Sequence, residues 1–159
     1  MQILTKWKIE KYRDGILYQV IEFEKNQIVA SGMEGLFQIL LTGDFPINEN
    51  TTKIKVGDSY TPTLWTMTDL QGTNTLAKDT LKTLWYVYDD NKGFISFMTI
   101  FDQNEANFYW WEIGLFRDID NRMFNRRVYP MGTKTQDDIF HAYCTFVFVA
   151  EEDVSIFPP

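Results

Sequence analysis

The stretch Trp110-Trp111-Glu112-Ile113-Gly114-Leu115-Phe116 decides the fold, because it is a dense apolar run with a single carboxylate and a single glycine. In the alternating register of a β-strand, one face of this run meets the core of a sandwich and the other points away from it. The face expected in the core comprises Tyr109, Trp111, Ile113 and Leu115, and the other comprises Trp110, Glu112, Gly114 and Phe116.

The carboxylate of Glu112 requires a local partner, because an unpaired buried charge costs several kcal/mol. Glu112 therefore either reaches solvent at a sheet edge or accepts hydrogen bonds from an arginine or a backbone amide. We expect a structural role for Glu112, with Arg126 or Arg127 as the donor. Gly114 indicates a bulge or a close approach of the backbone.

The composition indicates one domain with a substantial core, because the chain has 159 residues and 45% of them are hydrophobic. Aromatic residues make up 16% of the chain. This surplus predicts either an aromatic core or a protein–protein surface, where Tyr, Trp and Phe are enriched. A formal net charge of -7 argues against nucleic acid or an anionic membrane as a partner, because both attract basic patches.

Cysteine content and the N-terminal sequence bear on the compartment. Cys144 is the single cysteine, so no internal disulfide can form, which agrees with folding in a reducing cytoplasm. Residues 1–6 show no signal-peptide pattern, and no apolar run is long enough to span a membrane. We therefore expect neither secretion nor membrane insertion.

The N-terminus is predicted to form a β-hairpin. Residues 3–12 and 16–23 are extended, partly alternating runs, and the Asp-Gly pair between them favours a tight turn. An isolated hairpin is marginal in water, so its apolar face must pack against another surface. This surface belongs either to a neighbouring subunit or to the same domain. The apolar face is expected to contain Trp7, Ile9, Tyr18 and Val20.

A short helix is expected next. Ser31 and Glu34 have the spacing of a capping box before the apolar residues 36–41, and Gly43 occupies the position that commonly ends a helix. After it, residues 53–58 read as an alternating strand that ends in the turn at Gly57 and Asp58. Residues 59–79 read as an ordered excursion over the surface.

The second half of the chain reads as a meander of antiparallel strands. Besides the run around Glu112, the expected strands are residues 84–88, 94–101, 123–129 and 137–149. In the last strand, the core face comprises Phe140, Ala142, Cys144, Phe146 and Phe148. The opposite face is too apolar for free water and is a candidate contact surface. It comprises Ile139, His141, Tyr143, Val147 and Val149.

These elements predict a mainly β fold, an antiparallel β-sandwich with one short early helix and an N-terminal hairpin arm. The expected organisation is a hairpin arm at residues 1–25, a sandwich module at residues 26–150 and an acidic tail at residues 151–159.

The sequence offers no convergent catalytic or metal-binding pattern, so we expect no enzyme, no cofactor and no metal. His141 and Cys144 lie three apart in a predicted strand and point to opposite faces, which excludes a thiol–imidazole pair. The segment from Asp118 lacks the glycine and glutamate of a calcium loop. Glu105 and Glu112 show no sign of facing one sugar as a glycosidase pair.

The sequence resembles the tail-fibre and tail-collar type virion proteins of tailed bacteriophages. The resemblance covers roughly residues 26–149 and is most specific in the Glu-Ile-Gly-Leu-Phe strand at residues 112–116. Its other parts are Asn26-Gln27-Ile28 with Gly32 before the helix, Ile54-Lys55-Val56-Gly57-Asp58, Thr61-Pro62, Leu76, Tyr129-Pro130 and Lys134. The chain departs from that pattern at Val29 and Ser59, and it ends at Pro159 without a fibre shaft.

The resemblance implies a non-enzymatic attachment module on a virion. Such a module would assemble as a ring or trimer and join a fibre or another component to the tail, collar or baseplate. The hairpin would serve as a docking arm, and the outward face of the last strand would be a second contact. The interface candidates are Trp7, Ile9, Tyr18, Val20, Trp110, Phe116, Ile139, His141, Tyr143 and Val147. The candidates for a structural motif are Glu112, Gly114, Gly57 and Asp58.

Two alternatives stay open. The same module can serve as a decoration or head-fibre protein at the capsid or portal vertex, which the sequence does not separate from a tail position. A carbohydrate-binding sandwich would use exposed tryptophans such as Trp65, Trp85 or Trp110 to stack on sugars. It is disfavoured because these residues lack the polar cluster that a sugar site needs.

Overall fold

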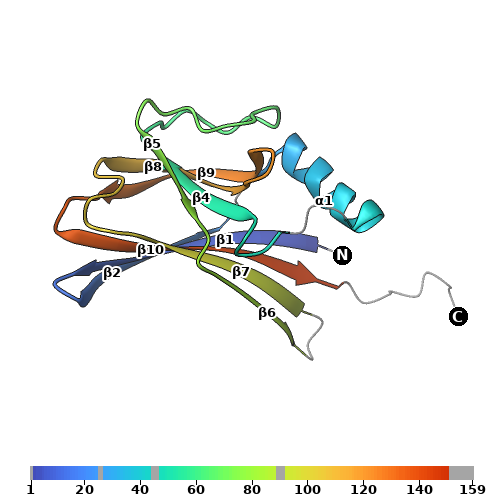
Figure 1. Ribbon diagram of the computed structural model, residues 1–159, viewed down its shortest axis with the longest axis horizontal. Helices are drawn as coiled ribbons and strands as arrows, with labels where there is room; N and C mark the ends of the chain where they lie inside the picture. The colour runs from blue at the N-terminus through green and yellow to red at the C-terminus, as the bar shows by residue number, and fades with distance from the viewer. Residues whose placement is uncertain (1, 25–26, 44–46, 89–91, 151–159) are drawn as a thin grey trace, which may run out of the picture.

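The computed structural model describes residues 2–24, 27–43, 47–88 and 92–150. Two antiparallel five-stranded sheets pack face to face, and one helix lies beside them (Figure 1). The mainly β sandwich with a single early helix is therefore confirmed. The predicted acidic tail at residues 151–159 lies outside the described residues.

The strand order separates the chain into two layers. The first sheet has the order β2 (Ile16–Glu24), β1 (Gln2–Arg13), β10 (Asp138–Val149), β7 (Lys92–Phe101) and β6 (Lys82–Tyr88). The second sheet has the order β3 (Gln27–Ile28), β9 (Arg122–Thr133), β8 (Tyr109–Arg117), β4 (Thr52–Gly57) and β5 (Thr75–Asp79). Strand β5 lies inside residues 59–79, the segment that was expected to be an ordered excursion over the surface.

The main core lies between the two sheets and is built from alternate residues of each strand. On β10, Phe140, Ala142, Cys144 and Phe146 are all buried, as predicted, and Phe148 packs against the same cluster while half-buried. Trp110 contributes from the second sheet, with its ring edge-on to Phe101 and Phe140 at centroid distances of 4.9 and 5.0 Å. Some of the aromatic residues that the sequence contains in surplus therefore fill the core.

The N-terminal hairpin forms, with Asp14 and Gly15 both at positive φ in its turn. It is not a projecting arm, however, because β1 pairs with β10 along its whole length. Trp7 and Ile9 are 1% and 0% exposed in the core, so both were wrong as interface candidates. The reason is register. Ile9 pairs with Ile21, which places both on the inner face, whereas Val20 pairs with Glu10 on the other face.

Helix α1 (Ala30–Thr42) ends as predicted at Gly43, whose φ is 70°. The predicted capping box is wrong, because Val29 is the N-cap residue and no side chain caps the helix. The Ser31 hydroxyl instead donates to the Met123 carbonyl, and Glu34 pairs with Arg122 of β9. The two residues that suggested a cap therefore make tertiary contacts.

Strand β8 departs from simple alternation. Its register with β9 shifts between Trp110 and Glu112, and such an irregularity changes which face a side chain occupies. Trp110 therefore enters the main core with Ile113 and Leu115, while Trp111 is half-buried beside Tyr60. On the opposite face of β8, Phe116 is 1% exposed under Leu70. Trp110 and Phe116 were thus wrong as interface candidates.

Candidate functional site

A buried ion pair fixes the outer side of the second sheet. Glu112 is fully buried, and its carboxylate accepts a hydrogen bond of 2.8 Å from Nε of Arg126, with Nη2 of Arg126 at 2.6 Å. The same carboxylate accepts backbone N–H bonds from Gln71 at 3.0 Å and from Gly72 at 2.6 Å. Arg126 also donates to the Thr63 hydroxyl. The predicted contact between Glu112 and Arg126 is present, and it ties the loop of residues 58–74 to the sheet.

The other residues of the predicted structural motif surround this ion pair. A Cβ atom on Gly57 would lie 2.5 Å from Oε1 of Glu112, so glycine leaves the space that the carboxylate fills. Asp58 accepts hydrogen bonds from the backbone and the side chain of Asn74, which close the loop. A Cβ atom on Gly114 would lie 2.8 Å from the Asn125 carbonyl oxygen, as a close backbone approach requires.

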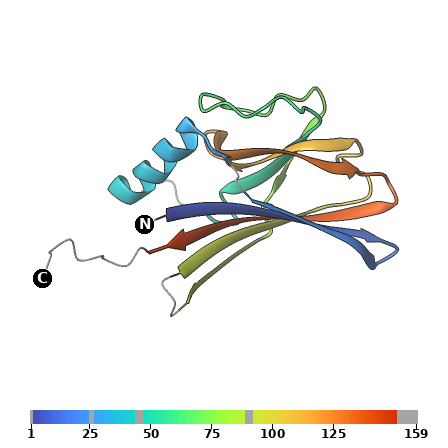
Figure 2. The same ribbon diagram turned by 180° about the vertical axis from the view of Figure 1, so that it is seen from behind.

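The first sheet has a face that no described element covers. Figure 1 and Figure 2 show the loop of residues 58–74 and helix α1 on the side of the second sheet, while the outer side of the first sheet is bare. We call this the open face. Strand register places Glu10 with His141, Lys8 with Tyr143 and Val147 with Phe94 on it.

One half of the open face is polar and is organised around Glu10. Its carboxylate accepts hydrogen bonds from Lys8 at 2.8 Å, Tyr12 at 2.9 Å and Tyr143 at 3.0 Å. The imidazole Nδ1 of His141 is 3.8 Å from the same carboxylate. The His141 ring also packs on Tyr12, with 4.5 Å between the ring centroids. These contacts hold the aromatic side chains half-buried against the sheet.

Burial and hydrogen bonds set the ionisation of this cluster. Burial acts to raise the pKa of Glu10, but hydrogen bonds from Lys8, Tyr12 and Tyr143 outweigh it and lower the pKa below its usual value. Burial, together with the hydrogen bond to Glu10, raises the pKa of Tyr143 to about 12. Burial also lowers the pKa of His141. The carboxylate is thus a weak base and the phenol a weak acid near neutral pH.

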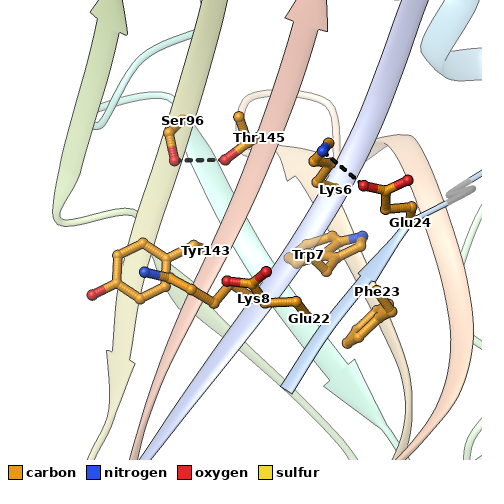
Figure 3. A pocket seen from close by; sticks show the side chains of 9 residues that line it. All are labelled: Lys6, Trp7, Lys8, Glu22, Phe23, Glu24, Ser96, Tyr143 and Thr145. Atoms are coloured by element: carbon orange, nitrogen blue, oxygen red, sulfur yellow. Dashed lines mark hydrogen bonds and ion pairs between the residues drawn. The ribbon is translucent and has the colours of Figure 1, made fainter. Parts of the chain in front are cut away.

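The other half of the open face combines apolar and basic side chains. A hollow of about 400 Å³ there is lined by Leu84, Phe94 and Val147, with Tyr143 at the boundary to the polar half. Lys6, Lys8 and Lys92 also line this hollow. A second hollow, of about 300 Å³, continues toward β2. Figure 3 shows this second hollow, where Lys6 reaches Glu24 and the hydroxyls of Ser96 and Thr145 meet between β7 and β10. Lys8 lies over the Tyr143 ring, 4.1 Å from its centroid.

The predicted interface residues divide into two groups. The structure places His141, Tyr143, Val147, Ile139 and Val20 on the open face or at its margin, through the register of β10 with β1 and β7 and of β1 with β2. Tyr18 is 48% exposed on β2 and donates a hydrogen bond to Asp138. The second group lies in the interior and comprises Trp7, Ile9, Trp110 and Phe116.

Two exposed apolar groups were not recognised from the sequence as protein contact residues, although Trp85 was considered for sugar stacking. Strand β6 carries Leu84, Trp85, Tyr86 and Val87, all more than half exposed. Helix α1 exposes Phe37, Leu40 and Leu41, whose spacing places them along one side of the helix. The signal in the sequence was the absence of alternation in β6, which indicates a strand with apolar groups on both faces.

The described residues hold no group of three or more His, Cys, Asp or Glu side chains suited to a metal ion. Cys144 is fully buried and accepts a contact from the Asn125 amide at 3.3 Å. Burial raises the pKa of its thiol to about 12, which makes the thiol a poor nucleophile. His141 lies on the opposite face of β10, as predicted.

Among the described helices, none has the length and apolar character needed to cross a membrane. Comparison of the chain with protein families, with curated proteins and with solved structures finds no match.

Proposed function

We propose that the chain is a structural protein of a bacteriophage virion, an adaptor at the tail, collar or baseplate that joins virion components through protein–protein contacts. The observation that carries this proposal is the open face of the first sheet. It combines an apolar hollow around Leu84, Phe94 and Val147 with a hydrogen-bonded polar cluster around Glu10. An apolar patch rimmed by polar groups is typical of a protein–protein contact surface.

The residues behind the resemblance to tail-collar proteins support the proposal in a second way. Gly57, Asp58, Glu112 and Gly114 all lie at or beside the ion pair between Glu112 and Arg126. They stiffen the second sheet and its covering loop, so we assign them a structural role and not a catalytic one. A rigid frame that carries one bare face suits an adaptor, because a preorganised surface loses little conformational entropy on binding.

The chemistry of the open face favours a protein partner over a sugar. A sugar site needs an exposed aromatic ring with convergent polar groups beside it. Trp110 is buried in the core, and Trp65 and Trp85 lie outside the polar cluster around Glu10. Tyr143 is covered by the Lys8 ammonium group on one side of its ring.

Immunogold labelling of purified virions tests the proposed location. Gold-labelled antibody against the chain is applied to intact particles and viewed by negative-stain electron microscopy. Label at the tail tip, collar or baseplate is the expected result. Label over the capsid would replace the adaptor with a decoration or head-fibre protein that uses the same open face. Absence of the protein from denatured, purified virions in a parallel immunoblot would overturn the virion proposal.

A further inference from the structure

Strand β6 forms an exposed edge of the first sheet. Among the described strands it pairs only with β7, so its other side presents backbone N–H and C=O groups. Soluble proteins protect such edges with charged side chains, proline or a bulge. Between Lys82 and Tyr88 the strand contains no proline, no acidic residue and no register shift against β7. We propose that β6 pairs with β6 of a second copy of this chain, antiparallel and across a two-fold axis.

Residues 84–87 of β6 are apolar and exposed on both faces, whereas Thr83 is half-buried beside the Glu49 carboxylate. Leu84 and Tyr86 lie on the open face, since Leu84 pairs with Ser96 and Tyr86 with Phe94. Trp85 and Val87 lie on the opposite, core-facing side, yet they are 76% and 69% exposed. Trp85 pairs with Ile95, which in turn pairs with the buried Phe146. The inner face of the first sheet thus extends beyond the area that the second sheet covers.

The directions of the edge strands favour pairing of β6 with β6 over pairing of β6 with β2. Successive neighbours in the first sheet are all antiparallel, so the edge strands β2 and β6 run in the same direction. A head-to-tail ring that joined β6 of one copy to β2 of the next would therefore need a parallel pair. A two-fold axis perpendicular to the sheet gives an antiparallel pair, as in every strand pair of the described chain.

Charge also favours β6 over β2 as the contact between copies. The chain carries a formal net charge of -7, so two copies repel each other over much of their surface. Edge strand β2 contains Glu22 and Glu24, whereas the only charged residue in β6 is Lys82 at its start. In an antiparallel self-pair, the two Lys82 residues lie at opposite ends of the interface and do not oppose each other.

The register of the pair follows from the length of the strand. Side chains alternate between the two faces of a strand, so the open face continues across the axis only if each residue pairs with one from the same face. In an antiparallel self-pair, this condition places one residue on the axis, opposite its own copy. Full overlap of a seven-residue strand places its middle residue, Trp85, on the axis. Leu84 then opposes Tyr86 of the second copy, and the two indoles meet on the core-facing side. This arrangement buries the two indoles against each other and leaves Leu84 and Tyr86 side by side on the continuous open face.

Oligomeric state and cysteine cross-linking test this proposal, which goes beyond the adaptor function and does not depend on it. Light scattering coupled to size-exclusion chromatography should give twice the chain mass of 18.8 kDa for the unmodified protein. Val87→Lys should give a monomer with unchanged circular dichroism. Leu17→Lys is the matched control on the other edge, where Leu17 is 46% exposed, and it should stay dimeric.

Cross-linking then reports the register directly. Cα atoms of directly opposed strand residues lie within disulfide range, so Trp85→Cys should form a disulfide-linked dimer under mild oxidation. Thr83→Cys and Val87→Cys, each displaced from the axis, should not. The native thiol of Cys144 is fully buried and gives no background.

Three results would overturn the proposal. A monomeric unmodified chain at every concentration would exclude the self-pair. A monomer for Leu17→Lys together with a dimer for Val87→Lys would assign the contact to β2. A dimer that cross-links at none of the three cysteine positions would place the contact on another surface.

Discussion

The two sheets of the sandwich differ in how their outer faces are treated. The second sheet is covered by the loop of residues 58–74, which is held by the buried pair of Glu112 and Arg126 and by contacts of Leu70 with Phe116. The first sheet leaves its outer face bare, with the half-buried side chains of Tyr12 and Tyr143 held in place by hydrogen bonds to Glu10. The difference separates the buried pair that holds the covering loop from the bare face that we propose for recognition.

The largest expected effect comes from breaking the buried pair under the covering loop. Glu112→Gln keeps the shape of the side chain but leaves the Arg126 guanidinium without a counter-charge at a site that is fully buried. We expect a loss of about 3–5 kcal/mol in the free energy of unfolding. Urea denaturation followed by tryptophan fluorescence measures it. Asp79→Asn, at a 76% exposed side chain, is the control. An unchanged melting temperature for Glu112→Gln would refute the anchoring role.

The first sheet has its own buried carboxylate, Asp138, which sharpens the comparison. Burial acts to raise its pKa, but hydrogen bonds from Thr135, Arg13 and Tyr18 outweigh it and lower the pKa to about 2. A carboxyl whose pKa is lowered in the folded state stabilises the protein above the ordinary value of 3.8, and this contribution is lost as the pH falls toward about 2. Asp138→Asn should therefore flatten the decline in unfolding free energy over this range.

Urea denaturation at several pH values checks this expectation. At neutral pH, Asp138→Asn should lose about 1.5–3 kcal/mol, the usual contribution of hydrogen bonds to a charged group. Asp120, whose pKa the Arg117 hydrogen bond lowers to about 2, remains in the variant and contributes to the decline that is left. Equal pH dependence of the variant and the unmodified chain would show that Asp138 contributes nothing to acid sensitivity.

Helix α1 provides a third test on the covered side. A Cβ atom on Gly32 would lie 2.1 Å from the backbone oxygen of Phe124, so Gly32→Ala must push the helix away from β9. The expected cost is about 1–3 kcal/mol of unfolding free energy. Gly93→Ala is the control, because its nearest neighbour would lie at an ordinary 3.5 Å. Thermal unfolding of both variants decides the matter, and equal melting temperatures would argue against close helix packing.

The smallest effect on stability is expected on the open face. Val147→Lys should change the unfolding free energy by no more than about 0.5 kcal/mol, since surface substitutions away from special features are mild. The same change should weaken binding to virion partners in a pull-down, because it replaces an apolar side chain beside Leu84 and Phe94 with a further positive charge. Ile119→Lys, in the exposed β8–β9 turn, is the matched control and should bind normally. Normal binding by Val147→Lys would show that the hollow around Leu84, Phe94 and Val147 is not part of the contact surface.

Local chemistry made part of this architecture predictable. A carboxylate within an apolar run needs a donor, so the cost of burying a charge predicted an arginine partner for Glu112, and of the two expected candidates, Arg126 and Arg127, the structure has Arg126. The core face of β10 followed from simple alternation, and Gly43 followed from its tolerance of positive φ. In each of these cases, the decisive interaction is local or is demanded by one residue.

The parts that could not be predicted depend on distant partners. The pairing of β1 with β10 joins the two ends of the described chain, and no local pattern indicates it. The register shift at Trp111 changes the faces of Trp110 and Trp111, so alternation placed Trp110 outside, while Ile113 and Leu115 lie in the core as expected. Ser31 and Glu34 have the spacing of a cap but bind β9 instead. The exposure of β6 depends on where the second sheet ends, which strand patterns do not reveal.

Hydroxyl-radical footprinting of the chain, free and assembled in virions, tests the central claim most directly. The account predicts that Leu84, Tyr143 and Val147 on the open face lose reactivity in the particle. Tyr60, which is 74% exposed on the covering loop, and Ile119 in the β8–β9 turn should keep theirs. Unchanged reactivity on the open face, with protection of Tyr60 and Ile119, would contradict the account and assign recognition to the covered side.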